Sequence, residues 1–258
     1  MPRAVRIVQR NAVVYRRIWR GSLFSSFLQP TLYLMSLGFG VGALIDPRRA
    51  AAIGGAANYL QFLAPGLLAA ACMQVASFES AWPVIGKIVW RRNYYAMLAT
   101  PLAIDDLIVG ELMWIAMRLT TVATAFMLVA SAFGVMRIAP ATPLAVLLAV
   151  VTGLAFSAPI VAYAATLKTG ANFNILFRLI ISPLFMFSGV FFPVDRLPAP
   201  VQWFAEVSPL YHGVQLVRGL TLGHLDPLVA MMHLIYLLAL FMAGFLAARY
   251  TFRRALYA

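Results

Sequence analysis

The chain of 258 residues is 63% hydrophobic and only 11% charged, whereas soluble domains are about 45–50% apolar and about 25% charged. This composition excludes a soluble globular protein. The 20 lysines and arginines outnumber the 8 acidic residues and give a net charge of +12. Because basic residues collect in the cytoplasmic loops of membrane proteins, this excess predicts a membrane protein in contact with anionic lipid, and no nucleic-acid partner.

Residues 1–22 predict an amphipathic helix in the plane of the membrane interface. At about 100° per residue, six arginines fall in one half of the helical circle, and apolar residues with Tyr15 fill the other. Such a two-sided helix suits the boundary between headgroups and acyl chains. A basic tail that only sets topology is the alternative. The residues that we single out in this helix are Arg6, Arg10, Arg16, Arg17 and Trp19.

Residues 23–258 contain six apolar blocks, each long enough to cross a bilayer core of about 30 Å. An even number of spans places both termini on one side of the membrane. If that side is the cytoplasm, thirteen lysines and arginines lie inside and five outside, which favours the orientation N-in, C-in. We therefore expect an all-α polytopic membrane protein with six transmembrane helices. The blocks are 23–45, 58–82, 107–133, 143–167, 173–192 and 228–250.

The longest predicted cytoplasmic connection is 83–106, and it is not a hydrophilic linker. Aromatic residues accompany Arg91 and Arg92 there, which is the composition of a protein contact surface. We expect a short helix that docks on a partner. A helix that touches only lipid headgroups is the alternative.

The long external connection, 193–227, is too apolar and aromatic for an open loop. Prolines divide it into pieces of helix length, and non-helical backbone at membrane depth has to be buried in protein or line a cavity. We expect one or two short re-entrant helices, at 200–207 and 210–221.

No catalytic motif occurs in the chain. Gly86 and Lys87 are followed by Ile88 and lack the upstream glycine of a phosphate-binding loop. The three histidines lack the spacing of a zinc site, and no Gly-x-Ser-x-Gly elbow occurs. We therefore expect no metal site and no enzyme in this chain alone, so the energy for its work comes from elsewhere.

Ionisable residues inside the spans are costly, and the default hypothesis for them is functional. We expect Glu79 to pair with Arg118 or Arg178. Glu111 and Arg118 lie on nearly the same face of one span but are too far apart along it to pair tightly. A substrate site and a structural polar cluster are equally good interpretations. The set is Glu79, Glu111, Arg118 and Arg178.

Several stretches of sequence resemble a known family. The segments are FSGVFFPVDRLP at 187–198, SPLYHG at 208–213, RGL at 218–220, MLATPL at 97–102, DLIVGELMW at 106–114 and YLQFLAPG at 59–66. The first three resemble the C-terminal motif of the ABC-2 type (type-2) membrane subunits of ATP-binding-cassette exporters. The others resemble the nodulation protein J branch of that family, which is associated with lipo-oligosaccharide export.

The resemblance implies a dimer of six-span subunits, formed with a second copy or a related permease, that bears two copies of a separate ATPase. ATP and Mg²⁺ would be bound by that ATPase, so this chain would hold no cofactor. The helix at 1–22 would be the connecting helix, and 83–106 would hold the coupling helix seated on the ATPase. The implied coupling contacts are Lys87, Trp90, Arg91, Arg92 and Tyr94, and the implied external gate residues are Ser188, Gly189, Phe192, Pro193, Pro198 and Pro209.

The sequence thus predicts the permease subunit of an ATP-driven exporter in a bacterial cytoplasmic membrane. Its cargo would be amphipathic: a glycolipid, a lipo-oligosaccharide or a cell-envelope saccharide. A drug or antibiotic exporter of the same family is the first alternative. A membrane-embedded enzyme such as an acyltransferase, or a passive channel or scaffold, represents other classes.

Overall fold

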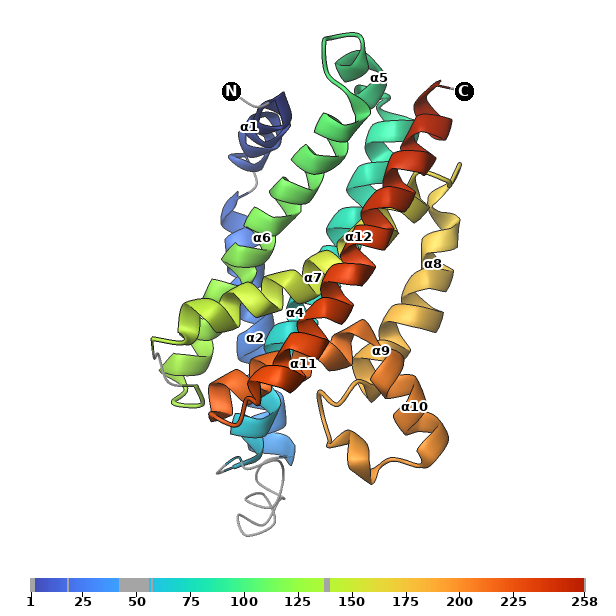
Figure 1. Cartoon of the computed structure of the whole chain (residues 1–258). Helices are drawn as coiled ribbons and strands as arrows, with labels where there is room; N and C mark the ends of the chain where they lie inside the picture. The colour runs from blue at the N-terminus through green and yellow to red at the C-terminus, as the bar shows by residue number, and fades with distance from the viewer. Residues whose placement is uncertain (1–2, 18, 42–55, 57, 137–139, 258) are drawn as a thin grey trace.

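The computed structural model describes residues 3–17, 19–41, 56, 58–136 and 140–257. These residues form helices joined by turns, and no β-strand occurs among them. The long helices lie side by side, and both chain ends lie at the same end of the bundle (Figure 1). We call this the terminal end, and we call the opposite end, where α10 (Ala199–Val207) lies, the far end.

Two helices replace the single N-terminal helix expected over 1–22. Helix α1 (Arg3–Tyr15) packs against α6 and buries Ala4, Ile7 and Asn11. Helix α2 begins at Trp19, runs to Met35 and continues as a π-helix, η1 (Ser36–Val41). The side of α1 that carries Ala4 and Ile7 packs on α6, Arg3 and Arg6 are exposed, and Arg10 is partly buried. The end of the first apolar block, 42–45, lies outside the described residues.

The core is formed by α4 (Tyr59–Ile85) and α7 (Thr142–Ala164), flanked by α6 (Ile104–Ala132) and α12 (Pro227–Tyr257). Helix α4 begins where the Asn58 side chain accepts a hydrogen bond from the Gln61 backbone N–H at 2.9 Å, a standard N-cap. Small residues bring the helices close together. At Gly244 of α12, a Cβ atom would lie 2.5 Å from the Pro159 nitrogen of α7.

Five helical stretches among the described residues are long and apolar enough to cross a membrane. They correspond to the second to sixth predicted blocks, with shifted ends. The first predicted block corresponds to α2 and η1, so the count of six spans stays a prediction. The five stretches are Tyr59–Trp90, Ile104–Ala132, Thr142–Ala164, Gly170–Phe187 and Pro227–Tyr257.

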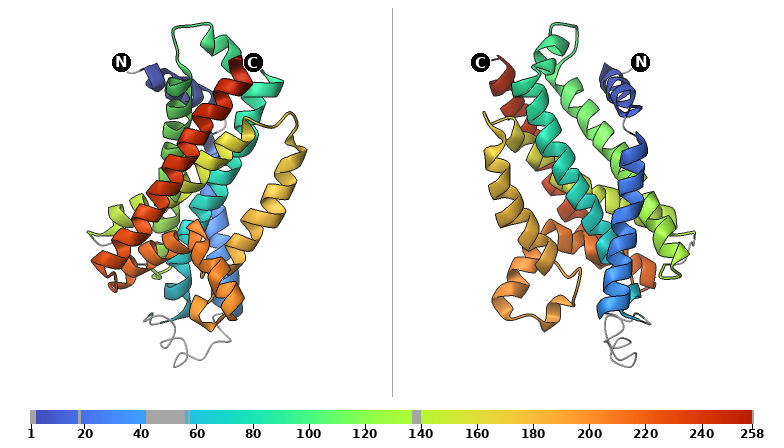
Figure 2. Two further views of the ribbon diagram at one scale, coloured as in Figure 1. Left: turned by 45° about the vertical axis from the view of Figure 1, so that its right-hand side comes forward. Right: turned by 180° about the vertical axis from the view of Figure 1, so that it is seen from behind.

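The stretch Gly170–Phe187 is a composite rod at one side of the bundle. Three of its helices alternate between α and π geometry, and few of its residues are buried. It stands apart from the other long helices in all three views (Figures 1 and 2). Its parts are η4 (Gly170–Asn172), α8 (Phe173–Leu176), η5 (Phe177–Ile181) and α9 (Ser182–Phe187).

After this rod, a 3₁₀ turn, η6 (Val194–Arg196), leads into α10 and then α11 (Pro209–Leu222). The two helices lie within one residue of the ranges that the prolines predicted. Helix α11 is capped by Ser208, whose hydroxyl accepts from the Leu210 N–H at 3.2 Å. It ends at Gly223, whose φ of 75° is one that glycine adopts without strain. Helix α11 packs on α4, α7 and α12.

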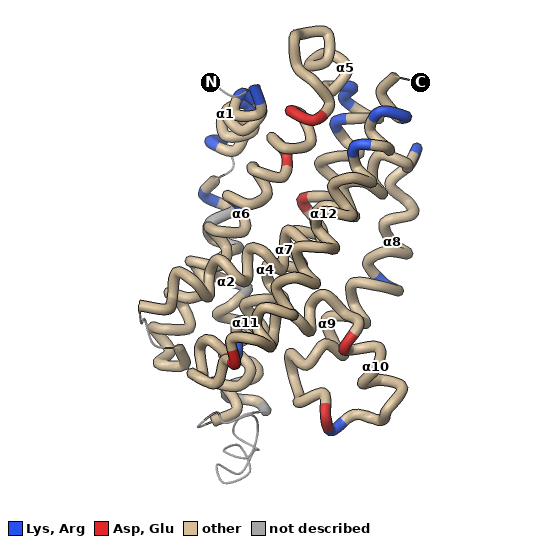
Figure 3. Tube along the Cα trace, in the orientation of Figure 1, with Lys and Arg blue, Asp and Glu red and all other residues tan. Residues whose placement is uncertain are grey.

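Lysine and arginine gather at the terminal end of the bundle, while the middle carries few charges (Figure 3). This is the distribution that the positive-inside rule predicts for a cytoplasmic terminal end. The orientation N-in, C-in stays a prediction that this asymmetry supports.

Candidate functional site

Three helices meet at a buried ion pair near the terminal end. The Lys87 amine lies 2.7 Å from Glu111 Oε1 and 2.6 Å from Oε2, and the Glu111 side chain is only 3% exposed. The Asn11 amide donates to Glu111 Oε2 at 3.3 Å, and the lysine donates to Asn11 Oδ1 at 3.4 Å. Because an unpaired buried charge is strongly destabilising, this network holds α1, the end of α4 and α6 in one arrangement.

A second ion pair lies deeper in the membrane region. Arg118 Nε donates to Glu79 Oε1 at 3.3 Å, and Arg118 Nη1 donates to the Tyr15 hydroxyl at 2.7 Å. The guanidinium carbon also lies 4.6 Å from the centre of the Tyr15 ring, a cation–π distance. That ring packs edge-on against Trp114, with 5.6 Å between the centroids. Of the two partners expected for Glu79, the structure therefore has Arg118.

Arg178, the other expected partner, is exposed on η5 and has no ion pair among the described residues. The structure thus brings three of the four predicted intramembrane charges into two ion pairs that lie about two helical turns apart. Glu111 bonds Lys87, a residue that the sequence placed on the cytoplasmic surface. Glu111 and Arg118 thus have different partners and do not bond to each other, as expected.

Two cavities open on either side of the Glu79–Arg118 pair, which lines both. One, of about 380 Å³, lies between α1, α4 and α6 and is also lined by Lys87 and by Trp82, Trp90 and Trp114. The other, of about 660 Å³, lies between α2, α4 and the α8–α9 rod. Four of its ten lining residues are aromatic: Tyr33, Phe78, Phe177 and Phe185. Apolar walls with a few polar groups suit an amphipathic ligand.

The connection 83–106 contains a short helix, as expected, and the end of α4 also extends into it. Helix α4 continues as a π-helix, η3 (Gly86–Trp90), and the chain turns at Arg92, where φ is 50°. A short helix, α5 (Asn93–Leu98), follows. Trp90 is 59% exposed and Arg91 and Arg92 are exposed, so these three side chains form an exposed turn at the end of α4.

Lys87 and Tyr94, from the same predicted coupling set, face inward. Tyr94 is fully buried, and the Lys87 amine lies 5.9 Å from the centre of its ring. Within the exposed turn, the Trp90 ring stacks on the ring of Trp82, with 6.4 Å between centroids. The turn is therefore supported from inside by aromatic packing and by the Lys87–Glu111 pair.

The predicted connecting-helix residues divide in a similar way. Arg6, Arg16 and Arg17 are exposed, and Arg10 is partly buried and lines the smaller cavity. Trp19 belongs to α2 and is exposed at its start. Helix α1 thus presents a basic outer face at the terminal end.

The predicted gate motif forms a hydrogen-bonded joint between α9 and α11. Ser188 and Ser208 are buried, and their hydroxyl oxygens lie 2.6 Å apart. Gly189 follows with φ of 77°. Phe192 is partly buried, Pro193 precedes η6, Pro198 is the N-cap of α10, and Pro209 is the first residue of α11.

Arg218 is a central residue of this joint that the sequence did not reveal. Arg218 is one of the five basic residues that the sequence placed outside the membrane. In the structure it is only 7% exposed. Its guanidinium donates to the backbone oxygens of Phe62 at 3.1 Å and Gly189 at 2.8 Å, and its carbon lies 3.7 Å from the Phe62 ring centre. The sequence signal that could have identified Arg218 was its position in the RGL segment of the family motif.

A histidine pair lies between α11 and α12. The Nδ1 atoms of His212 and His233 are 2.7 Å apart, and the His212 ring stacks on Tyr236 at 3.9 Å. His212 lies in the predicted external connection, and its ring is packed between the two helices. Within the described residues, no group of three or more metal-ligating side chains occurs.

Long apolar helices, with charge pairs held between them, define this chain as a polytopic membrane protein. The family model for the ABC-2 type transporter matches residues 4–222, so the chain belongs to the ABC-2 type transporter family. The resemblance found in its motifs is thereby confirmed.

Named relatives point to one branch of the family. The chain is 31% identical to nodulation protein J of Rhizobium leguminosarum bv. trifolii, over 85% of this chain and 81% of the relative. It is 31% identical to the protein of the same name from R. leguminosarum bv. viciae, over 83% and 80%. The corresponding protein of Rhizobium meliloti is 28% identical, over 87% and 82%.

Proposed function

We propose that this chain is the permease subunit of an ATP-driven exporter in a bacterial cytoplasmic membrane. It would work as a dimer, with a second copy or a related permease, together with two copies of a separate ATPase subunit that binds ATP and Mg²⁺. Membership of the ABC-2 type transporter family supports the transport role. The observation that carries the coupling is the exposed Trp90–Arg91–Arg92 turn at the end of α4.

The turn is suited to transmit force because it is continuous with a helix that reaches the cavities. Helix α4 and η3 run without a break from Tyr59 to Trp90. Glu79 lies on the same helix, about three turns from Trp90, and lines both cavities. Movement of the turn by an ATPase would therefore displace Glu79 and change its contact with Arg118 of α6.

We propose that the cargo is an amphipathic glycolipid, lipo-oligosaccharide or cell-envelope saccharide. The aromatic cavity of about 660 Å³ beside α8–α9 offers apolar and ring surfaces, and the adjoining ion pair offers hydrogen bonds to hydroxyl groups. The similarity to proteins named nodulation protein J supports this choice over a general drug exporter. Stimulation of ATP hydrolysis by lipid-linked sugars, and not by hydrophobic drugs, is the result that separates the two.

The coupling proposal is tested by reversing charge at the turn. The full chain would be co-expressed with the ATPase encoded beside its gene and purified through a tag on this chain alone. Arg91→Glu with Arg92→Glu should abolish co-purification and ATP hydrolysis. The matched control is Arg20→Glu with Arg253→Glu, two exposed arginines outside the turn, which should retain both.

The opposite results have distinct meanings. If the wild-type chain folds but no ATPase co-purifies with it, the exporter proposal fails. A scaffold or a membrane-embedded enzyme is then the better interpretation. If wild type binds the ATPase and the Arg91 and Arg92 double variant does so equally well, the exporter stands but its docking surface lies elsewhere.

A further inference from the structure

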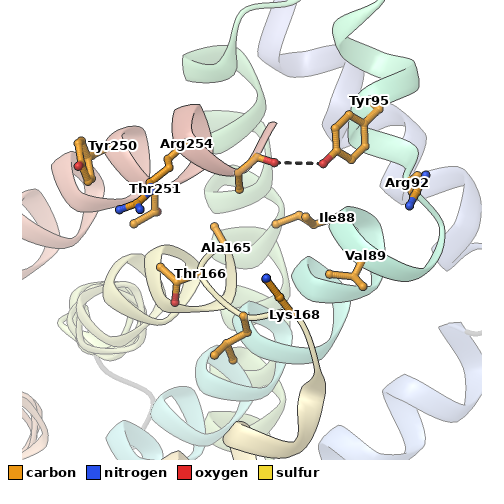
Figure 4. A pocket seen from close by; sticks show the side chains of 12 residues that line it. Ile88, Val89, Arg92, Tyr95, Ala165, Thr166, Lys168, Tyr250, Thr251 and Arg254 are labelled. Carbon is orange, nitrogen blue, oxygen red and sulfur yellow. Dashed lines mark hydrogen bonds between the residues drawn. The ribbon is translucent and has the colours of Figure 1, made fainter. Parts of the chain in front are cut away.

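A basic cavity of about 600 Å³ lies at the terminal end, separate from the two described above. It is bounded by η3 and α5, the turn that follows α7, and the last turns of α12. Arg92, Lys168 and Arg254 line it, and no acidic residue does. In Figure 4, Lys168 lies between Thr166 and Ile88, with Arg254 and Arg92 on opposite sides of it.

The positive charge of this basic cavity is not compensated within the described part of the chain. Arg92, Lys168 and Arg254 form no ion pair among the described residues. The neighbouring Arg249, by contrast, is neutralised by Asp105, with two N–O distances of 2.8 Å. The cavity therefore offers an unneutralised site for an anion.

The walls of the basic cavity combine phenol and apolar groups with these cations. Tyr95 and Tyr250 line it together with Ile88, Val89 and Leu167. The Tyr95 hydroxyl donates to the Ala255 backbone oxygen at 3.1 Å (Figure 4), which ties α5 to α12 across the cavity. A site with charged, phenolic and apolar walls fits the level of lipid headgroups, where aromatic side chains gather.

An apolar stripe leads from the basic cavity along the outside of α12. Tyr250, Leu246, Met242 and Leu238 are all exposed, and a spacing of four residues makes successive members neighbours on the helix surface. From Tyr250 to Leu238 the stripe extends about 18 Å, which is close to the thickness of one leaflet, about 15 Å.

We infer that the basic cavity binds the phosphoryl headgroup of an anionic phospholipid of the cytoplasmic leaflet, whose acyl chain lies along this stripe of α12. Basic pockets between transmembrane helices on the cytoplasmic side are suited to such headgroups. A free phosphate would satisfy the cations but leave the stripe uncovered. This inference concerns lipid binding, so it does not depend on the proposed cargo.

The test is native mass spectrometry of the full chain, titrated with phosphatidylglycerol or with phosphatidylcholine of the same acyl chains. Lys168→Gln with Arg254→Gln should weaken phosphatidylglycerol binding about tenfold or more, because each basic residue near the surface adds to the attraction. Arg20→Gln with Arg253→Gln removes the same charge from exposed positions outside the cavity and should bind as wild type does. Phosphatidylcholine should bind equally to all three proteins.

Three results would overturn the inference. One is equal phosphatidylglycerol binding by the cavity variant and wild type. Another is full displacement of the lipid by inorganic phosphate, which would indicate a simple anion site. The third is loss of the lipid when the ATPase subunit binds, which would assign the cavity to a protein contact. A single Lys168→Gln variant repeats the measurement if the double variant does not fold.

Discussion

Lys87 contacts both carboxylate oxygens of Glu111, at 2.7 and 2.6 Å, and this pair fastens the end of α4 to α6 directly behind the exposed Arg91–Arg92 turn. Because Asn11 of α1 bonds to both partners, three separate elements share one buried polar contact. The turn thus lies next to a buried ion pair, and displacement of the turn strains that ion pair.

Removing one partner of this pair should be more harmful than removing both. Lys87→Met alone leaves the Glu111 carboxylate buried and unpaired, which costs about 3–5 kcal/mol. Lys87→Met with Glu111→Leu leaves no buried charge, so thermal unfolding of the purified chain should return toward the wild-type temperature. Additive losses in the double variant would show that the two residues act independently.

The close contact between α1 and α6 depends on Gly110. A Cβ atom there would lie 2.7 Å from Ile7 Cβ and 2.8 Å from the Ala4 backbone oxygen, so Gly110→Ala should push α1 off α6. We expect faster protease cleavage within α1 and a loss of stability of about 1–3 kcal/mol. Gly21→Ala is the control, because nothing lies within 4 Å of its added Cβ. Cleavage unchanged by Gly110→Ala would argue against this docking.

The sequence was sufficient where the signal is local. Prolines predicted α10 and α11. The cost of charge inside a membrane predicted that Glu79 pairs with Arg118 or Arg178, and the structure has Arg118. The sequence was insufficient where a contact depends on the rotational phase of a helix or on residues far away in the chain. Lys87 turns inward because α4 continues through η3, and the acceptors of Arg218 lie 156 and 29 residues away in sequence. No local pattern encodes such partners.

Arg218 should not tolerate lysine, although the charge is kept. The guanidinium donates to backbone oxygens of two different segments and covers the Phe62 ring, and an ammonium group cannot reproduce that planar arrangement. Arg218→Lys should lower the unfolding temperature of the purified chain clearly. Arg196→Lys, at an exposed position, should leave it unchanged. Equal unfolding temperatures for the two variants would show that the geometry of the guanidinium is unimportant.

The Glu79–Arg118 pair lines both inner cavities, so its charge should influence transport more than folding. Glu79→Gln keeps an oxygen that can accept the Arg118 hydrogen bond, and the Tyr15 hydroxyl still accepts from Arg118 Nη1, which limits the cost to stability. The variant should unfold near the wild-type temperature and retain basal ATP hydrolysis with its ATPase. Stimulation by a lipid-linked saccharide should fall, because the cavity then carries an unbalanced positive charge.

Glu206→Gln, which changes an exposed glutamate near the far end, is the control and should retain that stimulation. If Glu79→Gln instead lowers the unfolding temperature and leaves stimulation intact, the pair is a structural brace and the cargo takes another path.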